Sequence, residues 1–114
     1  MFKPYTISLN RIHDRVQITE GDESLLLIVE GDAARMVSAL TEAQKVLRSL
    51  NNDSDEGERK QAALTFAQAM FGNAQAVKLI DFYHGDALCV IDVCGRYFSG
   101  RLAKLIGNAQ KRRT

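Results

Sequence analysis

At residues 24–32, SLLLIVEGD, the spacing of apolar side chains changes from the alternation of strands to the three- and four-residue spacing of helices. The apolar run at residues 25–29 has the length of a strand, and it does not alternate with polar residues. Such a run is typical of a strand that is central in its sheet or covered on both faces. Asp32 follows Gly31 and is suited to cap a helix, because its carboxylate can accept hydrogen bonds from free N–H groups. We therefore expect strands before this stretch and helices after it.

Two shorter segments before this stretch also have the pattern of strands. Residues 5–9 and 16–19 alternate apolar and polar side chains, which is the period of a half-buried strand. We expect a turn at His13-Asp14 and a hairpin turn at Gly21-Asp22, where glycine allows a positive φ. Three consecutive strands joined by short links predict an antiparallel meander over about residues 5–30.

Apolar side chains recur at helical spacing in the second part of the chain. The first stripe predicts a helix over residues 33–50 and consists of Met36, Leu40, Ala43, Leu47 and Leu50. A polar, acidic loop follows at residues 51–57, and we expect it to be flexible. A second helix is predicted over residues 58–71, and Gly72 is suited to end it.

Glycine and capping residues divide the remainder of the chain. We expect Asn73 to cap a short third helix that reaches Tyr83, and Gly85 to stop that helix. Asp86 then caps a last helical segment, which is either one helix interrupted at Gly95 or two helices.

The composition agrees with one globular domain. The chain has 114 residues, of which 46% are hydrophobic and 25% are charged, so it can bury a core without metals or disulfides. We expect a single α+β domain over residues 1–114, with an N-terminal three-stranded antiparallel meander followed by four to five helices up to about residue 110. No signal peptide and no stretch of ~18 apolar residues is visible, so we expect a cytoplasmic protein without a membrane contact.

Histidines and cysteines are the candidate reactive groups. His84, near Asp86, could act as a general base, but no nucleophile stands at a recognisable spacing, and a helix-terminal histidine is the simpler interpretation. A metal site that joins it to His13 is not indicated by the spacing. Cys89 and Cys94 are five positions apart in an apolar segment, which indicates reduced thiols in or near the core. We therefore predict a non-enzymatic protein with no catalytic residue, metal site or cofactor.

The C-terminal segment is basic. Residues 96–114 carry six Lys or Arg residues and no Asp or Glu. Such a helix can contact the phosphates of a nucleic acid, so a small nucleic-acid-binding accessory protein is the alternative function. No aromatic residue lies among the cations from Arg101 to Arg113, and no helix-turn-helix pattern precedes them. Helix termination or a protein contact is therefore favoured over nucleic-acid binding.

Aromatic residues concentrate in the second half of the chain. Most of them are expected in the core, but a subset could line a groove that receives a partner's apolar helix. The predicted partner-binding residues are Phe71, Phe82, Tyr83, Tyr97 and Phe98, with Arg101 and Lys104 as a charged rim. No reactive group accompanies them, so this pattern favours a binding protein over an enzyme.

Three segments resemble small proteins from the tail modules of tailed phages and prophages. They are residues 66–73, FAQAMFGN, residues 79–86, LIDFYHGD, and residues 97–102, YFSGRL. The resemblance spans about residues 25–113, and the family is that of tail assembly chaperones or related uncharacterised tail-module proteins. It implies a protein without catalytic residues in the cytoplasm of the host bacterial cell. The implied partners are tail-tube subunits and the tape-measure protein, whose apolar segments such a chaperone keeps soluble. Whether the chain also forms a homo-oligomer is left open.

Overall fold

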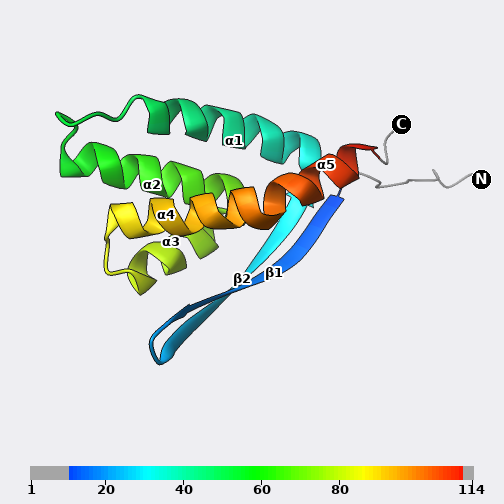
Figure 1. The fold of residues 1–114 in the computed structure, drawn as a ribbon, viewed down its shortest axis with the longest axis horizontal. Helices are drawn as coiled ribbons and strands as arrows, with labels where there is room; N and C mark the ends of the chain where they lie inside the picture. The colour runs from blue at the N-terminus through cyan, green and yellow to red at the C-terminus, as the bar shows by residue number, and fades with distance from the viewer. Residues whose placement is uncertain (1–10, 112–114) are drawn as a thin grey trace, which may run out of the picture.

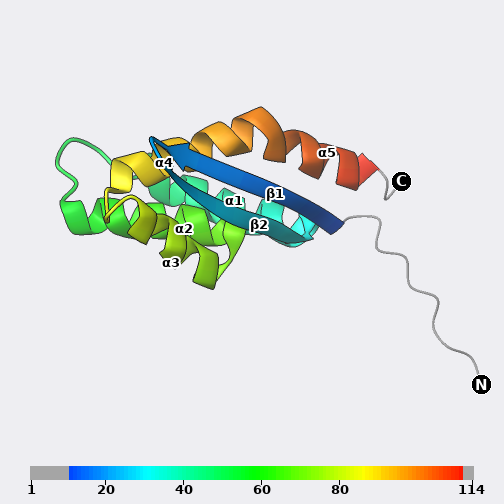
Figure 2. The same ribbon diagram turned by 90° about the horizontal axis from the view of Figure 1, so that it is seen from below.

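The chain forms a β-hairpin and a set of helices that lie on one side of it (Figure 1, Figure 2). The computed structural model describes residues 11–111. Its elements are β1 (Arg11–Glu20), β2 (Glu23–Asp32), α1 (Ala33–Arg48), α2 (Glu56–Phe71), α3 (Asn73–Phe82), α4 (Ala87–Tyr97), the π-helical turn η1 (Phe98–Leu102) and α5 (Ala103–Lys111). This arrangement is α+β, as the sequence predicts.

The two strands pair antiparallel through a two-residue turn. Gly21 has a φ of +57°, the left-handed conformation that a tight hairpin turn requires. The register runs from Glu20 opposite Glu23 to Arg11 opposite Asp32. The predicted hairpin turn is thus confirmed.

The predicted turn at His13-Asp14 was wrong, because both residues lie inside β1. Asp14 faces the helices with 7% of its surface exposed. Two helix side chains bind its carboxylate, so a charged residue can occupy a buried strand position. The first predicted strand, residues 5–9, lies outside the described residues. Within residues 11–111 the sheet is two-stranded rather than the predicted three-stranded meander.

β2 is uniformly apolar in its middle, but it buries only alternate residues. Leu27 and Val29 are fully buried in the core, whereas Leu26 and Ile28 on the opposite face are 56% and 40% exposed. The prediction of a central or doubly covered strand was wrong for the described part of the chain. There β1 is the strand neighbour of β2, and the helices pack on one face of the pair.

α2 is the helix around which the other elements pack. It contacts α1, α3, α4 and β2. Ala63 and Ala67 are almost fully buried along it, and small side chains at a contact let neighbouring helices approach closely. Phe66 and Met70 fill the core beside them.

Aspartates cap three of the helices. Asp32 and Asp86 accept hydrogen bonds from backbone N–H groups in the first turns of α1 and α4, as predicted. Asp55 caps α2 in the same way, with its carboxylate 2.7 Å from the Glu58 nitrogen. α2 therefore begins at Glu56, slightly earlier than the sequence predicts.

The connections between helices differ from the prediction at two places. Asn73 does not cap α3 but is its first residue, and Gly72, with a φ of +80°, turns the chain between α2 and α3. Gly95 does not interrupt the last helical segment, because α4, η1 and α5 follow one another without a break. The irregularity is instead the turn η1, where the backbone hydrogen bonds span one more residue than in an α-helix. We call residues 87–111 the C-terminal rod.

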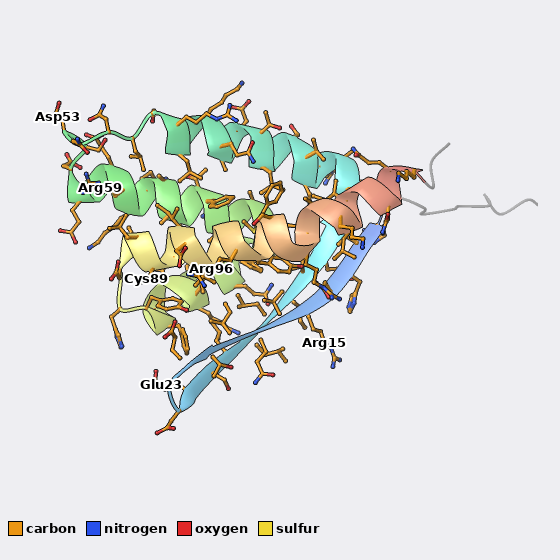
Figure 3. All side chains as sticks on the ribbon, viewed as in Figure 1. Arg15, Glu23, Asp53, Arg59, Cys89 and Arg96 are labelled. Carbon is orange, nitrogen blue, oxygen red and sulfur yellow. The ribbon has the colours of Figure 1, made fainter. Side chains whose placement is uncertain are left out.

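The predicted flexible loop connects α1 to α2 and contains local hydrogen bonds. The Asn51 N–H donates to Ser54 Oγ at 2.9 Å, and the Asp53 N–H donates to Asn51 Oδ1 at 2.8 Å. Arg59 of α2 donates to the Asn51 carbonyl at 3.2 Å, and Figure 3 shows Asp53 and Arg59 at this end of the molecule. The flexibility of the loop stays a prediction.

Candidate functional site

Phe71 is a core residue in the structure. Its side chain is 5% exposed, and its ring stacks on that of Tyr97 with the centroids 5.8 Å apart. The prediction that Phe71 lines a partner-binding surface was therefore wrong, because the C-terminal rod covers this end of α2.

Phe82 and Tyr83 pack against the same core and are partly buried. Their rings meet edge to face with centroids 5.1 Å apart, and the Tyr83 hydroxyl donates to Glu20 Oε1 at 3.0 Å. Burial and the Glu20 carboxylate raise the pKa of Tyr83 to about 12. Tyr83 thereby joins the end of α3 to the tip of the hairpin, so these two rings do not form an exposed aromatic surface.

The remaining predicted contact residues lie on the C-terminal rod. Phe98 lines an apolar pocket of about 150 Å³ between α1 and the rod, together with Leu40 and Ile106. Lys104 is exposed beside this pocket's residue Ala103. A partner contact at Phe98 or Lys104 stays a prediction.

A buried carboxylate on β1 brings two of the predicted residues together. The Arg101 guanidinium donates to both oxygens of Asp14, from Nε to Oδ2 at 2.6 Å and from Nη2 to Oδ1 at 2.9 Å. The Tyr97 hydroxyl donates to Oδ2 at 2.7 Å. We call these three residues the Asp14 anchor, because they fix β1 to the C-terminal rod.

The electrostatics of the Asp14 anchor favour the charged form of Asp14. The hydrogen bonds from Arg101 lower the pKa of Asp14, although burial opposes this shift. Burial and the hydrogen bond to Asp14 raise the pKa of Tyr97. At neutral pH the anchor is therefore a carboxylate held by one cation and one neutral hydroxyl, which is a structural ion pair rather than a proton-transfer site.

The sequence contains a signal for the Asp14 anchor, but the turn predicted at His13-Asp14 hid it. Ile12, Asp14, Val16 and Ile18 occupy the same side of an alternating strand, so Asp14 is a charge in an apolar row. A charge in such a row needs a partner of opposite sign. Arg101 was predicted as a partner-binding cation, and the structure instead pairs it with Asp14.

β2 is held by a neutral side chain from α3. Gln75 Oε1 accepts from the Ile28 N–H at 2.6 Å, and Gln75 Nε2 donates to the Ile28 carbonyl. The same Nε2 donates to the Phe71 carbonyl at 2.8 Å. The amide thus occupies the place that a neighbouring strand would take, and we call Gln75 with the Ile28 backbone the Gln75 anchor. The sequence does not predict it, since a glutamine on a helix carries no local signal of such a contact.

The most exposed aliphatic side chains of the two strands lie on the face of the hairpin that is turned away from the helices. We call it the outer hairpin face, and its central members are Arg11, His13, Arg15 and Gln17 of β1 with Leu26, Ile28 and Glu30 of β2. Arg15 lies opposite Ile28 and Gln17 lies opposite Leu26. Figure 3 shows Arg15 projecting from β1 away from the helices.

The candidate reactive groups do not come together. His13 lies on β1, and His84 lies in the turn between α3 and α4 with a φ of +55°. Cys94 is buried, and burial raises its pKa to about 12, whereas Cys89 is partly exposed. Within residues 11–111 no group of three His, Cys, Asp or Glu side chains is placed to hold a metal ion.

An apolar pocket lies between α2 and the turn that follows α3. Its volume is about 250 Å³, and Leu64, Ile80 and Val90 line it with Lys60 at its edge. Lys60 pairs with Glu56 at 3.4 Å, so the one cation at this pocket already has an acidic neighbour.

Two further findings concern membrane-spanning helices and similarity to known proteins. No helix in residues 11–111 combines the length and the apolar character that crossing a bilayer requires. Comparison of the chain with protein-family models, with curated proteins and with solved structures found no significant match.

Proposed function

We propose that this chain is a non-enzymatic assembly chaperone that binds an apolar helical segment of a client protein on the outer hairpin face. The observation that carries the proposal is the exposure of Leu26 and Ile28, 56% and 40%, in the middle of a strand whose other face is packed. A sheet with helices on one face and apolar side chains on the other is completed by a helix on the second face. The resemblance to tail-module proteins supplies the proposed client, an apolar segment of a phage tape-measure protein.

The physical basis is burial of apolar surface on a preformed platform. Each ~100 Å² of apolar surface covered contributes about 2.5 kcal/mol before the entropy cost of association. The Asp14 and Gln75 anchors hold both strands against the helices, so little ordering of the hairpin is needed on binding. A preorganised surface of this kind binds more tightly than a flexible one of equal area.

The structure lowers the support for the nucleic-acid alternative. Two cations of the basic segment are already paired: Arg96 with Asp92 at 3.1 Å, and Arg101 with Asp14 at 2.6 Å. The described part of the C-terminal rod therefore presents less uncompensated positive charge than the sequence indicates. Client binding that persists as salt rises supports the protein-binding function, because contacts to phosphates weaken steeply with salt.

Co-purification with tape-measure fragments tests the proposal. We expect the wild-type chain to retain at least one apolar fragment, and the double variant Leu26→Glu/Ile28→Glu to lose it, because two charges replace the apolar contact. The matched control is Leu88→Glu on α4, since Leu88 is also an exposed aliphatic residue, at 65%. Loss of the fragment by both variants, or no retention by the wild type across the whole set of fragments, would contradict the proposed surface.

A further inference from the structure

We infer that two copies of this chain pair edge to edge through the tip half of β1, antiparallel, with Ile18 of one copy opposite Ile18 of the other. The two hairpins then form one four-stranded sheet. The pairing uses backbone groups at the edge of β1, so it goes beyond the proposed function and does not depend on the client. The evidence is the contrast between the two edges of the hairpin.

Backbone groups of alternate residues face outward along each edge. Both the N–H and the carbonyl of Ile28 bond to Gln75, so the backbone of Ile28 faces away from β1. In an antiparallel pair, two opposite residues face outward together, and this arrangement repeats at every second residue. The residues of β1 that face outward are therefore Arg15, opposite Ile28, and nearer the turn Gln17 and Thr19.

The two edges differ in what covers them. α3 packs against β2, and Gln75 takes the place of a neighbouring strand there. The C-terminal rod reaches β1 at Asp14, away from the tip. Gln17 and Thr19 are exposed, and within residues 11–111 their outward backbone groups have no hydrogen-bond partner. Figure 1 shows this part of the hairpin projecting beyond the helices, and an exposed, unpaired edge is a template for another strand.

The register follows from the groups that are free. The Arg15 N–H already donates to the Asp14 carboxylate, so Gln17 and Thr19 are the residues with both backbone groups available. A two-fold axis beside Ile18 pairs Gln17 of each copy with Thr19 of the other, and each pair exchanges both of its hydrogen bonds. The two Ile18 side chains then meet across the axis on the packed face of the sheet, where Ile18 is almost fully buried.

The same register is electrostatically self-complementary. It brings Arg15 of each copy level with the Gly21-Asp22 turn of the other copy. The Arg15 guanidinium has no salt-bridge partner among the described residues, so Asp22 in that turn supplies an opposite charge. Registers shifted toward the start of β1 place Asp14 opposite Glu20, or Arg15 opposite Arg15, and like charges directly opposite each other are destabilising.

The paired sheet keeps the outer hairpin faces open. Opposite residues of antiparallel strands point to the same side of a sheet, so the outer faces of both copies lie on one side and all the helices lie on the other. The pairing covers neither Leu26 nor Ile28, because both residues are on β2. A dimer of this kind therefore presents two proposed client surfaces side by side.

Proline substitution at each edge tests the pairing. Thr19→Pro removes an N–H that makes no bond to β2, so the hairpin can keep its own hydrogen bonds. Ser24→Pro is the matched control, since Ser24 lies opposite Thr19 and its N–H faces the other edge. We expect sedimentation equilibrium to show a dimer for the wild type and for Ser24→Pro, and a dimer at least about tenfold weaker for Thr19→Pro. The NMR amide signals of Gln17 and Thr19 should shift as the wild type is concentrated.

A disulfide at the two-fold axis tests the register. Ile18 and its copy form a non-hydrogen-bonded pair with Cα atoms about 4.5 Å apart, a distance that a disulfide can bridge. Ile18→Cys should therefore cross-link on oxidation. Val16→Cys should not, because this register places residue 16 opposite Glu20 of the other copy. The wild type, which contains Cys89 and Cys94, shows the background.

Several outcomes would overturn the inference. A monomeric wild type at millimolar concentration, equal effects of the two prolines, or equal cross-linking of the two cysteine variants would each do so. Protection of the Gln17 and Thr19 amides from hydrogen exchange that does not depend on concentration would also do so, because the edge would then be covered within one chain. Retention of a tape-measure fragment by a strictly monomeric chain would leave the proposed function standing without the dimer. A dimer that retains no fragment would do the reverse.

Discussion

The two strands of the hairpin are fixed to the helices in different ways. β1 is held through a buried charged side chain, Asp14, by Arg101 and Tyr97 from the C-terminal rod. β2 is held through its backbone, at Ile28, by the neutral amide of Gln75 from α3. One anchor is an ion pair on the packed face of the sheet, and the other is an amide at its edge.

The difference shows how a sheet of two strands can be held without further strands. Two-stranded hairpins are marginal on their own, so each strand here is tied to a separate helical element. The Gln75 amide also satisfies edge groups that would otherwise be open to another strand. Since neither anchor uses the outer hairpin face, that face remains available for a partner.

The Asp14 anchor should be the stronger of the two. We expect Asp14→Ala to lower the free energy of unfolding by about 2–3 kcal/mol, because it removes three hydrogen bonds to a buried charged group. Chemical denaturation measures the change. The matched control is Glu30→Ala on the same hairpin, whose ion pair with Arg11 is exposed and should contribute less than ~1 kcal/mol. Equal effects of the two variants would mean that burial adds nothing to the Asp14 pair.

The Gln75 anchor should contribute less, because its partners are neutral and close to solvent. We expect Gln75→Ala to cost about 1–2 kcal/mol, and hydrogen exchange at the Ile28 amide to become faster while the Leu27 amide changes less. Gln61→Ala on α2 is the control, since Gln61 is exposed and donates only to Thr65, at 3.4 Å. Unchanged exchange at Ile28 in the Gln75 variant would show that the amide does not protect this edge.

Much of the fold could be predicted from local sequence signals. Periodicity and caps located the hairpin turn at Gly21, the helix starts after Asp32 and Asp86, and the boundary at Gly72. These features depend on neighbours within a few positions, so a single sequence contains them. The uniform apolar character of β2 was misleading, because the sequence does not show that the outer face of that strand stays exposed.

The anchors and the contact surface depend on tertiary placement. Asp14 lies 87 positions from Arg101, and Gln75 lies 47 positions from Ile28, so no local pattern joins either pair. A subset of the aromatic residues of the second half was predicted to line a partner-binding groove, yet within that subset Phe71 is buried in the core and Tyr97 packs against it.

The two anchors should also respond differently to acid. The lowered pKa of Asp14 means that the folded state binds fewer protons than the unfolded state near and below the ordinary value of 3.8. Stability from this group is therefore fully present above that pH and is lost as the pH falls through the folded pKa. Asp14→Asn should flatten the fall in unfolding free energy between about pH 5 and pH 2, with some slope left because the pKa of Asp86 is also lowered.

Gln75→Ala serves as the comparison for this pH series. It should lower the whole stability curve without changing its slope, because no proton is bound or released at the amide. Denaturation of the wild type and both variants across the acid range separates the two behaviours. Parallel curves for the wild type and Asp14→Asn would mean that Asp14 does not gain its charge stabilisation from Arg101.

The smallest effect concerns the π-helical turn that presents Arg101 to Asp14. Gly100 lies in η1, its φ is not positive, and a Cβ built there meets no atom within 4 Å. If the contact with Asp14, rather than the glycine, stabilises the π-helical turn, Gly100→Ala should be tolerated. It should then raise the free energy of unfolding by about 0.5–1 kcal/mol, as alanine does in helices. Gly95→Ala in α4 is the matched control, because Gly95 is equally open. A gain at Gly95 with a loss at Gly100 would show instead that the glycine itself holds the π-turn and that Arg101 reaches Asp14 only as a consequence.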